Sequence, residues 1–343
     1  MKNIFKLILL MLFAVSCEAT FLGNDEGNTS ENNFELLWHD FDEHYSLFNV
    51  RGFNWDSIYS VYRPRITEST SQNELWDVFV QMTSYLDDSH VFIFDPATEN
   101  LVASGSENEA QIEAETSPEL VRNSYIQNPK PIPNTPENEQ FFYGVTLTEN
   151  IGYLFLQGMD FDASRMDIVV HDLASTRGLI IDIRNNEGGS DRVAAEVAGR
   201  YTTERKLAYS VQEKNGPNHN DFANKKLFYT ETLGTQNYTK PIVILTDQET
   251  VSAAEIFLIR MKTLDNVTQI GDVTAGDFSD VSTRRFLPNG WQYQYSIFKV
   301  LLPNGSSLDG IGHIPDIYVR NTIEDLENGH DKVLERAIAY LNE

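Results

Sequence analysis

Short apolar runs alternate with stretches of helical periodicity from residue 151 onward, and this alternation constrains the fold more than any other feature of the chain. The alternating elements are three apolar runs and two helical stretches, at residues 151–156, 178–183, 241–245, 191–201 and 252–262. Strands separated by helices indicate an α/β layer structure. Two Pro-Asn-Gly turns, at Pro288 and Pro303, flank an alternating run and predict antiparallel additions to the sheet. We therefore predict an α/β core over residues 141–343, closed by an amphipathic helix around residues 331–341.

The part of the chain before this core has a different pattern. Between residues 34 and 94, large apolar side chains recur at helical spacing, as in Phe34, Leu37 and Phe41, and predict a small N-terminal helical subdomain. Residues 95–140 are rich in Pro, Asn and acidic side chains. Such a composition is typical of a connector without a compact fold of its own.

The first 17 residues have the features of a bacterial export signal. Lys2 and Lys6 precede an apolar stretch too short to span a bilayer, and residues 14–17 resemble a lipobox ending in Cys17. We expect Cys17 to be lipidated, residues 18–33 to form a flexible tether, and the protein to be anchored in the bacterial cell envelope. The alternative is an incidental cysteine in an ordinary cleaved signal. Cys17 is the only cysteine, so a disulfide within one chain is excluded.

Charge and motif content exclude several classes of partner. The chain has 26 basic and 51 acidic side chains, a formal charge of −25, which repels nucleic acid and favours neutral, basic or peptidic substrates. The sequence contains no zinc-protease helix motif, clustered Cys and His or calcium-binding loop. Neither a metal nor another cofactor is therefore implied.

Ser252 opens a predicted helix directly after an apolar strand and a tight turn. A serine displayed at a helix N-terminus can be a nucleophile, because the local amides and the helix dipole favour a developing oxyanion. The same residues, Ser252 to Glu255, also form an S-x-x-E capping box, in which the serine only satisfies free amides of the helix. This segment alone leaves both interpretations open.

A second motif, D-x-R-x-N-x-G-G at residues 182–189, follows another apolar strand. Paired glycines allow unusual backbone angles, and their amides can point toward a ligand oxygen. Any one of these residues could equally belong to a structural loop.

Together, these two motifs resemble those of the tail-specific or C-terminal-processing (S41-type) serine peptidases. Two further segments carry the resemblance, namely I-G-D-V-T-A-G at residues 270–276 and G-I-G-H-I-P-D-I at residues 310–317. The resemblance implies a crotonase-like or ClpP-like α/β core and hydrolysis of peptide bonds.

The resemblance also indicates the branch of the family. Processing proteases have a catalytic lysine just after the T-x-G segment, where this chain has Asp277, so another base is required. The tricorn-like branch uses a histidine that follows a serine, and the L-D-D-S-H segment ending in His90 matches that pattern. His90 is therefore the predicted general base, since imidazole titrates near working pH and a serine needs an adjacent base. The alternative for His90 is a structural partner of a helix C-terminus.

The remaining roles follow from the same resemblance. The tricorn-like pattern has a glutamate that corresponds to Asp309 here, and this shorter acid either orients His90 or merely forms an Asp-Gly turn. The expected oxyanion hole is made by the amide of Ala253 and that of Gly188 or Gly189. We therefore predict a serine endopeptidase that cleaves peptide or protein substrates through an acyl-enzyme. The alternative is a binding protein that keeps the peptidase fold without turnover. The oligomeric state cannot be predicted from the sequence.

Overall fold

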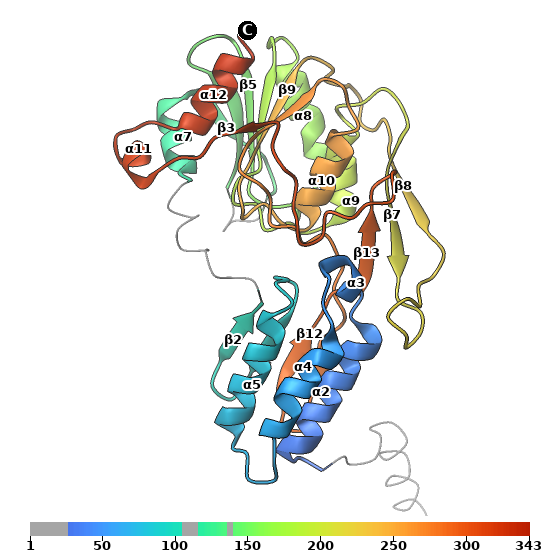
Figure 1. Ribbon diagram of the computed structural model, residues 1–343. Helices are drawn as coiled ribbons and strands as arrows, with labels where there is room; N and C mark the ends of the chain where they lie inside the picture. Colours follow the sequence, from blue (N-terminus) through green and yellow to red (C-terminus); the bar gives the residue numbers. More distant parts are fainter. Residues whose placement is uncertain (1–26, 105–115, 136–139) are drawn as a thin grey trace, which may run out of the picture.

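The computed structural model describes residues 27–104, 116–135 and 140–343, which form two lobes (Figure 1). The small lobe comprises residues 27–104 and 281–297, and the large lobe comprises the other described residues. Cys17, the predicted signal peptide and most of the predicted tether lie outside the described residues. No helix of the described ranges is both long and apolar enough to cross a membrane.

The small lobe combines a helical layer with a four-stranded antiparallel sheet of order β11-β12-β1-β2. Its helices are α2 (Ser30–His44), α3 (Phe48–Arg51), α4 (Trp55–Tyr62), η1 (Arg63–Arg65) and α5 (Gln72–Ser84). Its strands are β1 (Phe92–Asp95), β2 (Asn100–Ala103), β11 (Arg285–Phe286) and β12 (Gln292–Gln294). The predicted N-terminal helical subdomain is thus present, and it also contains strands.

Helix α2 begins earlier than the predicted tether allows. The Thr29 side chain accepts the Asn32 amide at 3.1 Å and caps the helix, and Ser30 and Asn33 are buried. The last residues assigned to the tether, 29–33, instead cap and begin a helix.

The hairpin of β11 and β12 joins the small lobe rather than the large sheet predicted for it. Strand β12 pairs antiparallel with β1, with Tyr293 opposite Ile93. In the small-lobe core, Tyr293 and Tyr295 pack beside Phe41. Trp291 packs against Trp76 and Phe79. Sequence periodicity identifies such strands but not their partners, because the pairing spans about two hundred residues.

The large lobe is built on a seven-stranded mixed sheet of order β14-β10-β9-β6-β5-β4-β3. Strands β5, β6, β9, β10 and β14 are parallel, whereas β3 and β4 are antiparallel to their neighbours. The strands are β3 (Ile126–Pro131), β4 (Phe141–Thr146), β5 (Gly152–Leu156), β6 (Leu179–Asp182), β9 (Ile242–Thr246), β10 (Val267–Gly271) and β14 (Ile317–Tyr318).

Helices cover both faces of this sheet (Figure 1). One face packs on η2 (Ala163–Arg165), α8 (Met166–Leu173), α9 (Asp191–Ala198) and α10 (Ala253–Met261). The other packs on α7 (Pro118–Ser124) and α12 (Lys332–Tyr340), with α11 (Ile323–Glu327) nearby in the chain. In β9, Ile244 joins the first core, whereas Val243 and Leu245 join the second. Burial on both faces explains why the central strands appear as continuous apolar runs.

A third sheet, of order β13-β7-β8, packs against the outer side of α10. Its strands are β7 (Lys206–Glu213), β8 (Lys226–Thr230) and β13 (Phe298–Leu301). Ile256 and Ile259 of α10 contact this sheet, whereas Phe257 and Leu258 face the large sheet. Helix α10 is therefore buried on every side, which fixes the position of its N-terminus.

The predicted connector at residues 95–140 contains regular structure. It includes β2, α7 and the edge strand β3 of the large sheet. Strand β3 contains Pro129 and Pro131, and proline is tolerated there because an edge strand has one unpaired side. The proline content that suggested a loop is compatible with this edge position.

Candidate active site

Ser252 lies in a strained turn between β9 and α10, at the carboxyl end of a central strand. Its backbone angles are φ 59° and ψ −122°, a conformation that costs a non-glycine residue about 1–3 kcal/mol. An ordinary N-cap residue has an extended backbone instead. The Ser252 amide donates to the Asp277 carbonyl oxygen at 3.1 Å and approaches Glu255 Oε2 at 3.3 Å. The surrounding structure therefore holds the turn in its unfavourable conformation.

Gly188, the first residue of the glycine pair, packs directly against this turn. Gly188 and Gly189 have φ +90° and +128°, and a Cβ placed on Gly188 would lie 2.7 Å from the Ser252 Cβ. The same Cβ would lie 3.0 Å from the Ala253 nitrogen. Only a residue without a side chain permits this approach.

The amides around Ser252 differ in whether they are already bonded. The Gly188 amide donates to Asn186 Oδ1 at 3.0 Å, and Asn186 is itself fixed by donating to the Leu156 carbonyl oxygen at 2.7 Å. Within the described ranges, the amides of Gly189 and Ala253 donate no hydrogen bond. Of the three predicted oxyanion-hole donors, Gly189 and Ala253 are therefore the pair available to a ligand.

His90 comes from the small lobe, on the loop between α5 and β1. Its amide donates to Asp88 Oδ1 at 3.0 Å, and its carbonyl oxygen accepts Gln294 Nε2 at 3.2 Å. The ring is half-buried, and its Nδ1 atom is buried without a hydrogen-bond partner in the described part of the chain. Hydrogen bonds thus fix the backbone of His90, whereas the Nδ1 atom of its ring is left without a partner among the described residues.

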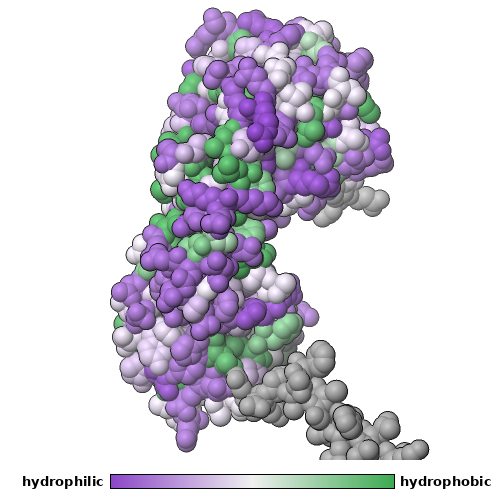
Figure 2. Space-filling model, turned by 90° about the vertical axis from the view of Figure 1, so that its right-hand side faces the viewer, coloured by the Kyte–Doolittle hydropathy of each residue, from purple (hydrophilic) through white to green (hydrophobic). Residues whose placement is uncertain are grey.

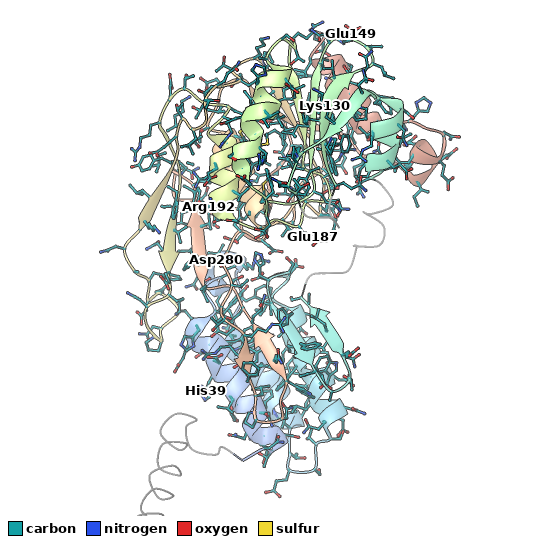
Figure 3. The ribbon with its side chains drawn as sticks, turned by 180° about the vertical axis from the view of Figure 1, so that it is seen from behind. His39, Lys130, Glu149, Glu187, Arg192 and Asp280 are labelled. Carbon is teal, nitrogen blue, oxygen red and sulfur yellow. The ribbon has the colours of Figure 1, made fainter. Side chains whose placement is uncertain are left out.

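Asp277 connects the His90 loop to the Ser252 turn. Its Oδ2 accepts the Ser89 hydroxyl at 2.6 Å and the Ser89 amide at 3.0 Å, while its carbonyl oxygen accepts the Ser252 amide. Asp277 therefore links the Ser252 turn to the residue next to His90 across the junction of the two lobes. Figure 2 shows that the molecular surface narrows at this junction, and in Figure 3 Glu187, next to Gly188, faces the small lobe from the edge of the large lobe.

Asp309 is buried near this junction, but its carboxylate has other partners. It accepts the Phe278 amide at 3.1 Å and the Ser307 hydroxyl at 2.8 Å, and among the described residues it has no hydrogen bond with His90. Burial raises the pKa of Asp309 to about 7. One of these contacts is local, with Ser307, and the other joins Asp309 to a residue 31 positions earlier in the chain.

Glu255 is a buried site residue whose role the sequence did not reveal beyond the capping motif. Its carboxylate accepts the Thr274 hydroxyl at 2.5 Å and the amides of Gly276 and Asp277, each at 2.9 Å. Burial raises its pKa to about 8. Glu255 thus holds residues 274–277 against the start of α10.

The contacts of Arg51 and Asp88 in this site were also not predicted from the sequence. Arg51 pairs with Asp277, and Asp88 is fully buried, where it accepts the hydroxyls of Tyr45 at 3.0 Å and Ser296 at 2.8 Å. Asp88 lies within the L-D-D-S-H segment, but Arg51 has no local sequence signal. In the described ranges, no cluster of three or more His, Cys, Asp or Glu residues could hold a metal ion.

The layered sheet and the serine turn define the fold class of the S41 peptidases. Residues 150–319 match the family model described as Peptidase family S41, and residues 28–84 match that of the tricorn protease C1 domain. A crystal structure of a protein described as a peptidase, from Parabacteroides merdae, superposes with a TM-score of 0.82 at 28% identity, covering 92% of this chain and 97% of that chain. The chain belongs to peptidase family S41.

More distant proteins agree with this assignment. Carboxy-terminal processing protease CtpB of Bacillus subtilis is 26% identical over 42% of this chain and 28% of its own length. The corresponding Bartonella bacilliformis protease is 26% identical over 54% of this chain and 42% of its own length. The chain thus spans less than half of these curated relatives. The structure of mature CPAF complexed with lactacystin shares the fold, with a TM-score of 0.69 at 12% identity over 90% of this chain and 97% of that chain.

Proposed function

We propose that this protein is a serine endopeptidase that cleaves peptide or protein substrates through an acyl-enzyme. Ser252 attacks the scissile carbonyl carbon, and His90 takes the serine proton and returns it to the leaving amine. Water then hydrolyses the ester on Ser252, with His90 again acting as the base.

The observation that carries the proposal is the pair of unbonded amides beside Ser252. In the tetrahedral intermediate, the former carbonyl oxygen becomes an anion that needs fixed donors. Ala253 directly follows Ser252, and Gly189 directly follows the glycine that contacts Ser252; the amides of both have no internal acceptor among the described residues. Ala253 is also the first residue of α10, so the positive end of the helix dipole acts on the same anion. A simple N-cap requires neither the strained serine nor the adjacent glycine pair.

The proposal is tested by labelling the full-length, detergent-solubilised chain with a fluorescent fluorophosphonate. The wild type should be labelled, Ser252→Ala should not, and His90→Gln should be labelled at least ~100-fold more slowly. Ser71→Ala is the matched control, because Ser71 caps α5 with an ordinary extended backbone far from the glycine pair. This control should lose about 1 kcal/mol of stability but keep its labelling. A folded wild type that is not labelled would instead support the binding protein without turnover.

We also propose that Cys17 carries a lipid that anchors the protein in the cell envelope. The support is the basic start, the short apolar stretch and the lipobox-like residues before Cys17. Cys17→Ser should move the protein from the membrane fraction to the soluble fraction of the expressing bacteria. Wild-type protein that is already soluble would contradict the anchor.

A further inference from the structure

Asp277 is a buried carboxylate that makes contacts in both lobes. Its amide donates to Glu255 Oε2 at 2.9 Å, and its carbonyl oxygen accepts the Ser252 amide at 3.1 Å. Its side chain reaches the small lobe, where Oδ2 accepts both the amide and the hydroxyl of Ser89. One residue therefore joins the backbone that holds the nucleophile to the backbone that holds the base.

Arg51 completes this connection from the small lobe. Its guanidinium pairs with Asp277 Oδ1, donates to the Gly276 carbonyl oxygen at 2.9 Å, and donates to the carbonyl oxygens of Leu86 and Asp87. These two carbonyls begin the loop that carries His90. Arg51 and Asp277 together thus bind residues 86–90 to residues 276–277 across the junction.

The charge of His90 acts on the Asp277 carboxylate and is one of the causes that oppose the rise in its pKa. Burial and the charge of Asp88 raise the pKa of Asp277, whereas Arg51 and the Ser89 hydrogen bond oppose that shift. Three donors on a carboxylate favour its ionised form. The Asp88 carboxylate accepts the backbone amide of His90 and the hydroxyls of Tyr45 and Ser296. The oxygens of Asp309 bond Phe278 and Ser307.

Glu187 faces the small lobe from the edge of the large lobe, and Glu255 and Tyr45 are two further titratable groups at the junction. Glu255 is bonded to residues 274–277, and the Tyr45 hydroxyl donates to Asp88 at 3.0 Å. Neither contacts Ser89 or His90 by a hydrogen bond within the described residues. Asp277 thus contacts the residue next to the base through its carboxylate, and the residue that attacks through its backbone carbonyl oxygen.

We propose that Asp277, rather than Asp309, is the acidic positioning residue of this site. Its carboxylate holds the Ser89–His90 segment against the Ser252 turn, and its negative charge stabilises the imidazolium that forms when His90 takes the serine proton. The inference deepens the proposed peptidase function and rests on it. The chain thereby uses an acid at the position where processing proteases have a catalytic lysine.

The test measures the titration of His90 and the labelling rate on the same samples. Full-length protein carrying isotope-labelled histidine is titrated by NMR, and the His90 ring signal is identified by its loss in His90→Gln. In Asp277→Asn the midpoint of this titration should move to lower pH by about one unit, because a negative neighbour favours the charged ring. In Asp309→Asn the midpoint should move by less than about a third of that amount. An equal or larger shift in Asp309→Asn, or none in Asp277→Asn, would overturn the proposal.

Fluorophosphonate labelling separates this inference from the peptidase function. Asp277→Asn should be labelled about 10- to 100-fold more slowly than wild type, with partial recovery in Asp277→Glu, which keeps the charge. A titration shift in Asp277→Asn, together with no labelling of the folded wild type, would refute the peptidase while leaving the positioning role intact.

Circular dichroism shows whether Asp277→Asn is folded. If it is not, Ser89→Ala is used, since this variant keeps the ion pair with Arg51 and loses only the hydroxyl contact. Its ring-signal midpoint should stay near that of the wild type, while its His90 signal should broaden as the segment loosens. A signal as sharp as that of the wild type would then contradict the positioning role.

Discussion

Gly188→Ala is a direct probe of the contact between the glycine pair and the serine turn. The new Cβ would lie 2.7 Å from the Ser252 Cβ, 2.9 Å from the Val251 oxygen and 3.0 Å from the Ala253 nitrogen. Restoring an ordinary contact of 3.4 Å to the Ser252 Cβ requires a movement of 3.4 − 2.7, or about 0.7 Å. Backbone contacts on the same side prevent a simple rotation of a side chain from relieving the clash. The turn itself must therefore move.

The expected effects on stability and on activity can be separated. A positive φ costs alanine roughly 1–2 kcal/mol, and overpacking adds roughly 1–3 kcal/mol, for a total of about 2–5 kcal/mol. A displacement near 1 Å at a reacting centre costs on the order of 100-fold in rate, and loss of one oxyanion donor costs 100- to 1,000-fold. We therefore expect labelling by a fluorophosphonate to slow at least about 100-fold.

Gly290→Ala is the matched control, because it measures the cost of a positive φ for alanine without the overpacking. Gly290 has φ +91°, almost the angle of Gly188, but nothing lies within 4 Å of its Cβ position. Its substitution should cost only about 1–2 kcal/mol in urea unfolding and leave the labelling rate unchanged. If folded Gly188→Ala is labelled within about threefold of Gly290→Ala, then the close approach does not set the geometry of the nucleophile, and the reasoning fails.

Two further predictions concern buried titratable side chains of the large lobe. The fully buried Arg184 pairs with Asp182 at 2.6 Å and with Asp331 at 2.9 Å. Arg184→Met should lower the free energy of unfolding by about 3–5 kcal/mol in urea titrations, because both carboxylates would be left buried without a compensating charge. The control Arg192→Met, on the surface, should change it by less than about 0.5 kcal/mol, and equal losses would contradict the argument. Burial lowers the pKa of His313 to about 3, so the unfolded chain binds the additional proton and stability is lost as pH falls from about 6.5 toward 3. The free energy of unfolding of His313→Gln should therefore fall less than that of wild type between pH 7.5 and pH 5. The difference should be up to about 1.4 kcal/mol for each pH unit below pH 6.5, and an unchanged pH dependence would refute the assignment.

The elements that sequence analysis predicted best are those buried on both faces. Strands β5, β6 and β9 and helices α9, α10 and α12 lie close to their predicted positions, since uninterrupted burial gives uninterrupted apolar runs. The edge strand β3 was predicted as a loop because its prolines give the same local signal in both structures. The local sequence pattern thus predicted well which segments are buried, but it did not predict which strand lies at the edge of the sheet.

The candidate site was predictable in its residue types but not in its connections. Ser252 as cap and Ser252 as nucleophile share one sequence, and only the backbone angle and the unbonded amides distinguish them. The contact of Ser89 with Asp277 joins residues 188 apart in the chain, and such a separation leaves no local periodicity. The expectation for Asp309 came from a resemblance, and the carboxylate oxygens instead bond to Phe278 and Ser307.

The β11–β12 hairpin makes the His90-bearing lobe depend on a late part of the chain. Until residues 291–295 are synthesised, β1 lacks its neighbour β12, and the aromatic core around Phe41 lacks Trp291, Tyr293 and Tyr295. Contacts of such high sequence separation form late, after a large loss of chain entropy. His90, the proposed general base, therefore gains this support only after Ser252 has been synthesised, and a chain that ends before residue 291 lacks these contacts.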